Sequence, residues 1–310
     1  MKIVKTSFNG RQYMMRRNFE LLHLCDRRLK GVSDHYHNYY EVYFLNSGAD
    51  VEYQIEGVSY TLRPGDILII NCFDVHKSII NVNSLYDRVV FWIDPQYLRS
   101  LGSKETNLCR CFENTVLRSR NLIRLEKEAL YTVKSTLGKL EKAYFGENFG
   151  NDLLIESHIR EIMIMLNRAC LDIKEERIES DICVNKIVES ALRLITENLS
   201  ADLSLDRLSN ELFVSKYHLS REFKKNVGYT IHQYITLKRL LMAEELLLFN
   251  DVSVTEVCTR CGFRDYSNFI RTFTKYYGMP PGQFSNTSGR YTGTVRVNDS
   301  AYDEHAVEIG

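Results

Sequence analysis

The stretch VSVTEVCTRCGFRDYSNFIRTFTKYYGMPPGQF (252–284) decides the fold of the second half of the chain. Ser253 and Glu256 stand three residues apart, which is the spacing of a capping box at the start of a helix. Gly262 then supplies a tight turn, and Gly278 ends the longer helix that follows. A short helix, a turn and a second helix together predict a helix-turn-helix unit.

The same layout occurs once more upstream, in LSLDRLSNELFVSKYHLSREFKKNVGYTIHQY (203–234). Ser215 in this copy and Asp265 in the other are placed to cap the longer helix, and Gly228 ends it. Matched positions are Leu208 with Val257, Leu219 with Phe269, Arg221 with Arg271, Phe223 with Phe273, Lys225 with Lys275 and Gly228 with Gly278. An internal repeat of this kind predicts two related helical units between residues 185 and 286.

The longer helix of each unit separates an apolar face from a polar one. The side chains predicted to point inward are Leu219, Phe223 and Val227 in the first copy, and Phe269, Phe273 and Tyr277 in the second. The outward side chains predicted to bind DNA are Lys216, Tyr217, Ser220, Arg221 and Lys224, then Ser267, Asn268, Arg271 and Lys275. One polar face is ordinarily only solvated, but two matched copies favour DNA, with arginine reading guanine and lysine holding phosphates.

The second copy resembles the second helix-turn-helix of AraC/XylS-type transcription regulators. The residues that carry the resemblance are Gly262, Phe263, Phe269, Phe273, Gly278 and Pro281, and the segment YITLKRLLMAEELLL (234–248) fits the helix that joins the two units. The resemblance implies two units that read successive major grooves about 34 Å apart on one face of DNA. Ile270, Thr274 and Ser285 depart from the family pattern, so we expect weaker DNA contacts from the second unit.

The first 95 residues predict β-structure. Short segments rich in Tyr, Val and Ile are separated by turn residues: YYEVYFL (39–45), DVEYQIEG (50–57), VSYTL (58–62), DILIIN (66–71) and RVVFWI (88–93). Such spacing predicts a small antiparallel barrel or sandwich. The fold class expected for the chain is therefore α+β and multidomain, with a cupin-like barrel, a helical connector and an all-α double helix-turn-helix.

Apolar residues at helical spacing follow from residue 121. They predict an antiparallel helix pair over 121–175, after a barrel domain at 1–120. The charged stretch that follows is expected to be a linker at 176–184, and the polar end of the chain, 287–310, a disordered tail. The helix pair can pack against the barrel, and the resemblance implies that it also joins two copies in a homodimer; both can hold, because a helix pair has more than one face. The candidate contacts are Leu125, Val133, Leu137 and Leu140.

A second stretch with chemistry in it is HYHNYYE (35–41). On a strand, alternate residues share a face, so His35, His37, Tyr39, Glu41 and Tyr43 are expected on one side, with His76 opposite. The spacing resembles the cupin pattern, and cupins include metal enzymes. Three interpretations stay open: an effector pocket without metal, a metal site made by His35, His37, Glu41 and His76, or a polar core cluster.

A downstream DNA-reading module favours the effector pocket, because a regulator needs a ligand that shifts an equilibrium and has no need of turnover. Aromatic side chains beside His and Glu suit a sugar. We therefore predict a regulator with no cofactor and no enzymatic activity, with double-stranded DNA, an effector and a second copy as partners, and RNA polymerase as a further possible one. The alternatives are a cupin metalloenzyme fused to a DNA-binding module, and a constitutive DNA-binding protein.

Composition narrows the class further. The chain has 310 residues, no net charge and 44% hydrophobic residues, as in a globular protein. The N-terminus lacks the apolar core of a signal peptide and no apolar run is long enough for a membrane span, so a cytoplasmic protein is expected. Its eight cysteines include Cys109-x-Cys111 and Cys258-x-x-Cys261, but neither pair has a second pair nearby, so free thiols are expected instead of a zinc site.

Overall fold

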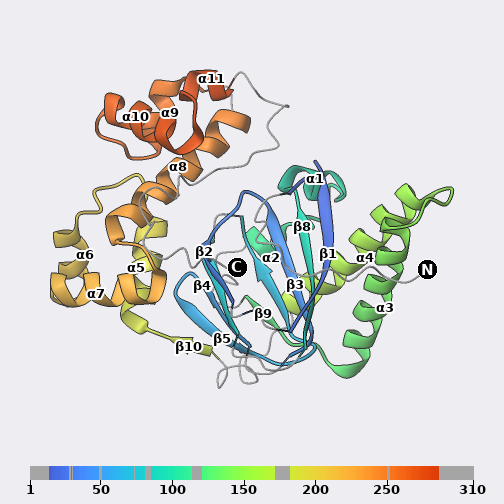
Figure 1. Cartoon of the computed structure of the whole chain (residues 1–310). Coiled ribbons are helices and arrows are strands. Elements are labelled where there is room, and N and C mark those ends of the chain that lie inside the picture. The colour runs from blue at the N-terminus through green and yellow to red at the C-terminus, as the bar shows by residue number, and fades with distance from the viewer. Residues whose placement is uncertain are drawn as a thin grey trace, which may run out of the picture. The chain divides into compact units, whose positions relative to one another are not determined.

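The computed structural model describes residues 14–27, 29, 31–48, 51–72, 74–80, 85–113, 121–171, 182–249 and 252–285. The chain folds as two compact units, Met1–Glu189 and Ser190–Gly310 (Figure 1). The first contains antiparallel sheets with helices, and the second is helical, which confirms the α+β class. No helix among the residues described above is long and apolar enough to cross a membrane.

The first unit contains two five-stranded antiparallel sheets. The first sheet has the order β1 (Phe19–Asp26), β8 (Tyr86–Ile93), β3 (Tyr40–Ser47), β6 (Ile67–Ile70) and β9 (Leu122–Ile123). The second has the order β10 (Ile182–Val184), β5 (Val58–Leu62), β4 (Val51–Ile55), β7 (His76–Ile80) and β2 (Gly31–His35). The strands expected at 39–45, 50–57, 58–62, 66–71 and 88–93 are all present, as β3, β4, β5, β6 and β8.

Alternation along β3 divides the core into two layers. Tyr40, Val42 and Phe44 belong to a cluster that joins the first sheet to the helices. Tyr43 and Leu45 belong to a second cluster, which side chains of both sheets form together. The two sheets therefore pack face to face, and helices cover the outer face of the first sheet (Figure 1).

Four helices pack on that outer face: α1 (Pro95–Ser100), α2 (Arg110–Glu113), α3 (Lys127–Tyr144) and α4 (Asn151–Leu171). The last two form the expected helix pair, but α3 begins six residues later than the start expected at 121. Leu122 instead lies in strand β9 and pairs with Leu68. The predicted helix began too early because its first apolar residue, Leu122, is buried in a strand, and apolar residues in short buried strands and in helices look alike in the sequence.

The residues of the helix pair that were expected to contact a second copy are not on its exposed surface. Val133, Leu137 and Leu140 are buried in the chain's own core, with exposures of 0%, 5% and 0%, and Leu125 packs against the same cluster. These residues were named as candidates for contact with a second copy; they pack against the first sheet instead, and dimerisation through the helix pair stays a prediction. The end of the expected linker also differs, since 182–184 form strand β10 beside β5; residues 176–181 and the tail at 287–310 lie outside the described residues.

The second unit consists of helices that meet expectation closely. After α5 (Lys186–Glu197) come α6 (Leu205–Glu211), α7 (Lys216–Val227), α8 (Ile231–Phe249), α9 (Val254–Arg260), α10 (Tyr266–Tyr277) and α11 (Pro281–Ser285). All six side chains predicted to point inward from α7 and α10 are buried. The long helix α8 contacts both helix-turn-helix units. Its Tyr234 packs on Phe223 of α7, and the Tyr277 hydroxyl of α10 lies 2.9 Å from Oε2 of its Glu244.

Candidate DNA-binding surface and histidine cluster

Each helix-turn-helix unit is fixed at its helix ends by the residues that the sequence predicts. Ser215 Oγ accepts a hydrogen bond from the backbone N–H of His218 at 3.2 Å, and Asp265 Oδ1 accepts one from Asn268 at 2.5 Å. The backbone turns left-handed at Gly228, with φ of 84°, and this residue ends α7. These caps set where α7 and α10 begin, and hence which side chains face away from the core.

The expected capping box at α9 is only half formed. Ser253 Oγ accepts a hydrogen bond from the Glu256 N–H at 3.2 Å, as predicted. The carboxylate of Glu256, however, pairs with Arg260 one helical turn later. The Ser253 cap by itself therefore fixes the start of the helix.

The outward face of α7 is basic and exposed. Arg221 has a side chain that is 59% exposed, and its guanidinium carbon lies 6.0 Å from the ring centroid of Tyr217. Lys224 is exposed one turn later, while Lys216 at the first turn pairs with Asp206 of α6. Ser220 is half-buried between them. An arginine steadied by an aromatic ring and followed by a free lysine can place one group on a base edge and another on a phosphate.

The outward face of α10 carries fewer charged side chains than that of α7. Arg271 donates a hydrogen bond from Nη2 to Oδ1 of Asn268 at 3.1 Å, and both residues are exposed with Ser267 and Lys275. Ile270, which departs from the family pattern, is half-buried and packs against the core of this unit. Ile270 is therefore apolar because it packs in the core, and the outward face of α10 has one polar side chain fewer.

The histidines of HYHNYYE meet His76 in the first unit, although they do not share one strand. Strand β2 ends at His35 and β3 begins at Tyr40, so His37 lies in the connection between them. His35 and His76 pair across strands β2 and β7. One ring nitrogen from each of the three histidines lies within 4.8 Å of the others, and the His35 and His76 ring centroids are 4.1 Å apart.

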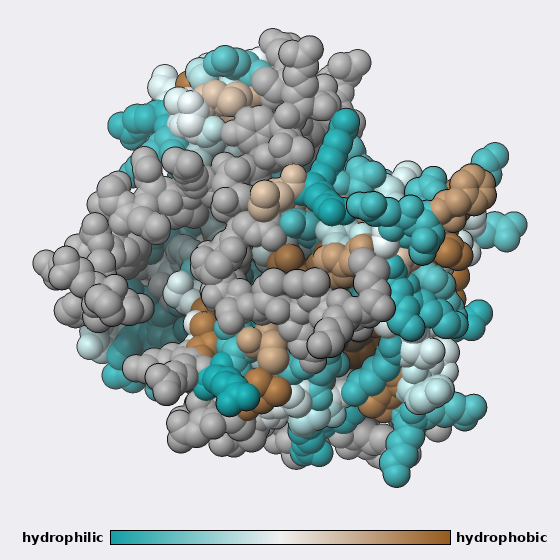
Figure 2. Space-filling model, turned by 45° about the vertical axis from the view of Figure 1, so that its right-hand side comes forward, coloured by the Kyte–Doolittle hydropathy of each residue, from teal (hydrophilic) through white to brown (hydrophobic). Residues whose placement is uncertain are grey.

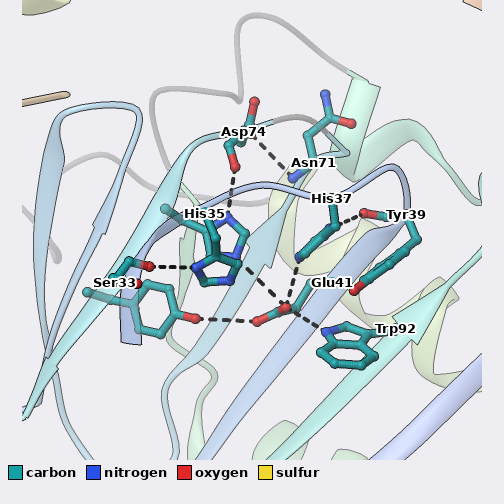
Figure 3. Close-up of polar contacts among 10 residues, drawn as sticks. Ser33, His35, His37, Tyr39, Glu41, Asn71, Asp74 and Trp92 are labelled. Atoms are coloured by element: carbon teal, nitrogen blue, oxygen red, sulfur yellow. Dashed lines mark hydrogen bonds and ion pairs between the residues drawn. The ribbon is translucent and has the colours of Figure 1, made fainter. Parts of the chain in front are cut away.

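Each imidazole is held by a backbone carbonyl (Figure 3). Nδ1 of His35 lies 2.8 Å from the Ser33 oxygen, and Nδ1 of His37 lies 2.9 Å from the Tyr39 oxygen. Nδ1 of His76 lies 2.7 Å from the Asp74 oxygen.

Glu41 completes the histidine cluster, by which we mean His35, His37, His76 and Glu41. Its Oε2 lies 3.1 Å from Nε2 of His37 and 4.0 Å from Nε2 of His76, and it accepts a hydrogen bond from Trp92 Nε1 at 2.7 Å (Figure 3). The hydroxyl of Tyr53 donates to Oε1 at 3.4 Å. The carboxylate is 3% exposed, so these contacts replace water around it.

Charge within the histidine cluster favours a bound cation. Burial lowers the pKa of His35 to about 4 and lowers the pKa of His76 well below its usual value. Burial alone would raise the pKa of Glu41, but the contact with His37 and the nearby His76 lower it to about 2. At neutral pH the cluster therefore holds an ionised carboxylate beside imidazoles of His35 and His76 that carry no charge.

The two tyrosines expected to contact a sugar are already occupied. The Tyr39 ring stacks on His37 with centroids 4.0 Å apart, and the Tyr43 hydroxyl lies 2.5 Å from that of Tyr86. Tyr39 is 4% exposed and Tyr43 is 2% exposed. Both side chains support the histidine cluster or the core around it, which favours a ligand smaller than a sugar at these residues.

Sequence reasoning missed the residues that orient the cluster. Trp92 and Tyr53 come from strands β8 and β4, far from HYHNYYE in the chain. Strand β4 alternates between buried and half-buried residues, but β8 is buried throughout, so no local pattern marks Trp92. Glu56, at the end of the segment expected as a strand at 50–57, has a role that the sequence does not indicate. It holds the backbone before His76, since its N–H donates to the Val75 oxygen and its Oε1 accepts from the Val75 N–H, both at 2.8 Å.

The arrangement in the second unit is that of a DNA-binding protein with two helix-turn-helix units, and comparison with known proteins agrees. The family model described as a helix-turn-helix domain matches residues 208–287. The HTH-type transcriptional activator RhaS of Salmonella arizonae is 23% identical over 248 residues, which cover 80% of this chain and 85% of RhaS.

Two solved domains resemble the C-terminal part of the chain. The C-terminal domain of the response regulator yesN from Fusobacterium nucleatum is 33% identical, covering 33% of this chain and 99% of that one, with a TM-score of 0.32. A transcriptional regulator of Chromobacterium violaceum with an AraC-type DNA-binding domain is 25% identical, covering 34% and 94%, with a TM-score of 0.32. By its sequence, the chain is an AraC/XylS-type transcription regulator.

Proposed function

We propose that this regulator binds operator DNA with α7 and α10, each placed in one of two successive major grooves. The observation that carries the proposal is the repetition itself: both helices start at a side-chain cap and leave arginine and lysine exposed. Arg221 and Arg271 read bases in this proposal. The phosphate contacts come from Lys216, Lys224 and Lys275, and the remaining base or backbone contacts from Tyr217, Ser220, Ser267 and Asn268.

The test is selection of operators from random duplexes by the full chain, followed by fluorescence anisotropy. We expect two short conserved elements on one face of DNA, about 10 base pairs apart. Inserting about five base pairs between them places the elements on opposite faces and should reduce affinity to that of a single element. Unchanged affinity after the insertion would contradict simultaneous use of α7 and α10.

In the same proposal, the first unit supplies regulation and assembly. Occupancy of the histidine cluster by an effector changes DNA affinity, which separates the chain from a constitutive DNA-binding protein. Copies pair through exposed apolar side chains of the helix pair, among which Tyr131 is 76% exposed and Leu153 is 67% exposed. Hydrophobic residues reach the surface on the right-hand side of Figure 2, the side that carries α3 and α4 in Figure 1.

The regulator works in the cytoplasm without turnover in this proposal. Relatives named as transcriptional activators support that class, and they support RNA polymerase as a further partner. A metalloenzyme joined to a DNA-binding module is the alternative, and no observation of this chain favours it over the regulator. Sedimentation of Leu153→Asp beside the unchanged chain tests the assembly: we expect a dimer that the substitution converts to monomer.

A further inference from the structure

The hydrogen bonds of the histidine cluster define the protonation of its rings. A backbone carbonyl can only accept, so each Nδ1 that faces one must carry the hydrogen. In a neutral imidazole the other nitrogen, Nε2, then has a lone pair and no hydrogen. His35, His37 and His76 therefore present three Nε2 lone pairs within the same small volume.

These lone pairs lack a complementary donor within the described part of the chain. Nε2 of His76 is buried and has no hydrogen-bond partner there, which is costly for a polar atom. Nε2 of His37 faces Oε2 of Glu41 at 3.1 Å, so two acceptors meet unless a positive charge lies between them.

We propose that His35, His37, His76 and Glu41 bind one divalent first-row transition-metal ion through the three Nε2 atoms and Oε2. Imidazole nitrogen suits zinc, nickel, cobalt, copper and iron, whereas magnesium and calcium need more oxygen ligands than one carboxylate offers. The three histidine nitrogens lie close together, His37, His76 and Glu41 are buried, and a carboxylate ligand offsets part of the charge of such an ion.

Distances agree with this use. Two donors that bind one ion at about 2.1 Å each lie about 3.0–3.4 Å apart at angles between octahedral and tetrahedral. The His37 to Glu41 separation is 3.1 Å, within that range. The nitrogens of the three histidines lie within 4.8 Å of one another, so binding draws them closer by a small side-chain adjustment. His35, at the end of strand β2 and half-buried, is the ligand best placed to adjust.

The groups around the ligands are those that orient metal-binding side chains. Metal-bound histidines ordinarily donate their second N–H to a carbonyl or carboxylate, and loss of such a partner costs about 10- to 100-fold in affinity. Here Ser33, Tyr39 and Asp74 supply the carbonyls, and Trp92 holds the carboxylate of Glu41. This inference concerns binding alone and stands or falls separately from the DNA-binding proposal.

The test is metal titration of the full chain, stripped with a chelator and dialysed free of it. Co²⁺ absorption and calorimetry with Zn²⁺ should both saturate at one ion per chain. His35→Gln, at the half-buried ligand, and Glu41→Gln should each weaken Zn²⁺ binding by at least about 100-fold, more than loss of an outer partner. His158→Gln is the matched control, since His158 lies on α4, outside the cluster, and should leave binding unchanged.

Thermal unfolding with and without Zn²⁺ guards against variants that merely fold poorly. At the same Zn²⁺ concentration, Zn²⁺ should raise the Tm of the unchanged chain and of His158→Gln clearly more than that of His35→Gln, whatever the starting Tm of each. Absence of Zn²⁺ and Co²⁺ binding to the unchanged chain, or equal binding by His35→Gln, Glu41→Gln and the control, would overturn the proposal.

Discussion

The two units handle polar side chains in opposite ways. In the sheet unit, His23 is 7% exposed and bridges two carboxylates: its Nδ1 lies 2.7 Å from Glu141 and its Nε2 lies 2.8 Å from Asp87, residues 118 and 64 positions away in the chain. In the helical unit, Arg221 is exposed and its place follows from one helix and its cap. Buried polar groups must be paired, whereas exposed ones remain available to a ligand. Substitutions should therefore change stability in the first unit and DNA binding in the second.

The largest effect is expected from His23→Leu, which leaves Glu141 and Asp87 buried without their partner. Breaking such a buried set costs about 3–5 kcal/mol of unfolding free energy. Urea denaturation of the full chain, followed at a signal from the sheet unit, measures the loss. His158→Leu on α4 is the control, and a similar cost for both variants would contradict a special role for the bridge.

The contribution of His23 to stability should depend on pH. Burial alone lowers the pKa of His23, but the contacts with Glu141 and Asp87 raise it above the usual 6.5. A raised pKa in the folded chain means that the contribution is fully present below about pH 6.5 and is lost as pH rises through the folded value. The stability difference between the unchanged chain and His23→Leu should accordingly shrink as the pH is raised. A constant difference would show that packing alone accounts for it.

The next largest effect is expected at two glycines of the helical unit, one held by its backbone conformation alone and one also by a contact distant in the chain. Gly262 has φ of +77°, and an added Cβ would meet the Leu199 backbone oxygen at 2.6 Å. Gly278 has φ of +74° with nothing within 4 Å of such a Cβ. Gly278→Ala should cost about 1–2 kcal/mol for backbone conformation alone, and Gly262→Ala about 2–4 kcal/mol because the clash adds to it. Thermal unfolding of both variants measures the two costs. Equal costs would mean that the backbone at Leu199 moves aside without a measurable loss of stability.

Phe213 sharpens this point, because it is the counterpart of Gly262 in the first helix-turn-helix unit. It adopts φ of +54° and is 95% exposed. A non-glycine residue is therefore tolerated at this turn where the side chain has solvent to enter. Glycine at 262 is required by the close approach of another segment, which the local sequence pattern alone does not reveal.

These comparisons explain what could be predicted from the sequence. Caps, turns and inward faces of α7 and α10 depend on residues a few positions apart, so Ser215, Asp265 and Phe273 were placed correctly. The extent of α3 was wrong because sheet pairing of Leu122 depends on Leu68, which is distant in the chain. Residues that assemble the histidine cluster could be partly foreseen from alternation, but their partners on β4 and β8 could not.

Arg221→Ala tests the exposed side of the comparison. Loss of one arginine that reads a base should cost about 1–3 kcal/mol of binding free energy and relax specificity at one base position. Because α10 carries fewer polar side chains outward, Arg271→Ala should cost less. Anisotropy with the selected operator and single-base variants measures both. Arg168→Ala, which removes an exposed charge from α4 in the other unit, should change nothing, and an equal loss on random DNA would assign Arg221 to phosphates.

Lys224→Ala is expected to have the smallest effect on specific binding, because a lysine that contacts phosphate carries no sequence information. Affinity for all duplexes should fall about equally, since the lost interaction is with the backbone common to all of them. The slope of log affinity against log salt should flatten by about 0.9, the value for one phosphate contact. Salt titrations with operator and random DNA measure it, with Lys134→Ala of α3 as the charge-matched control. A changed base preference with an unchanged salt slope would move Lys224 from the phosphates to the groove, and would place base reading on two adjacent turns of α7.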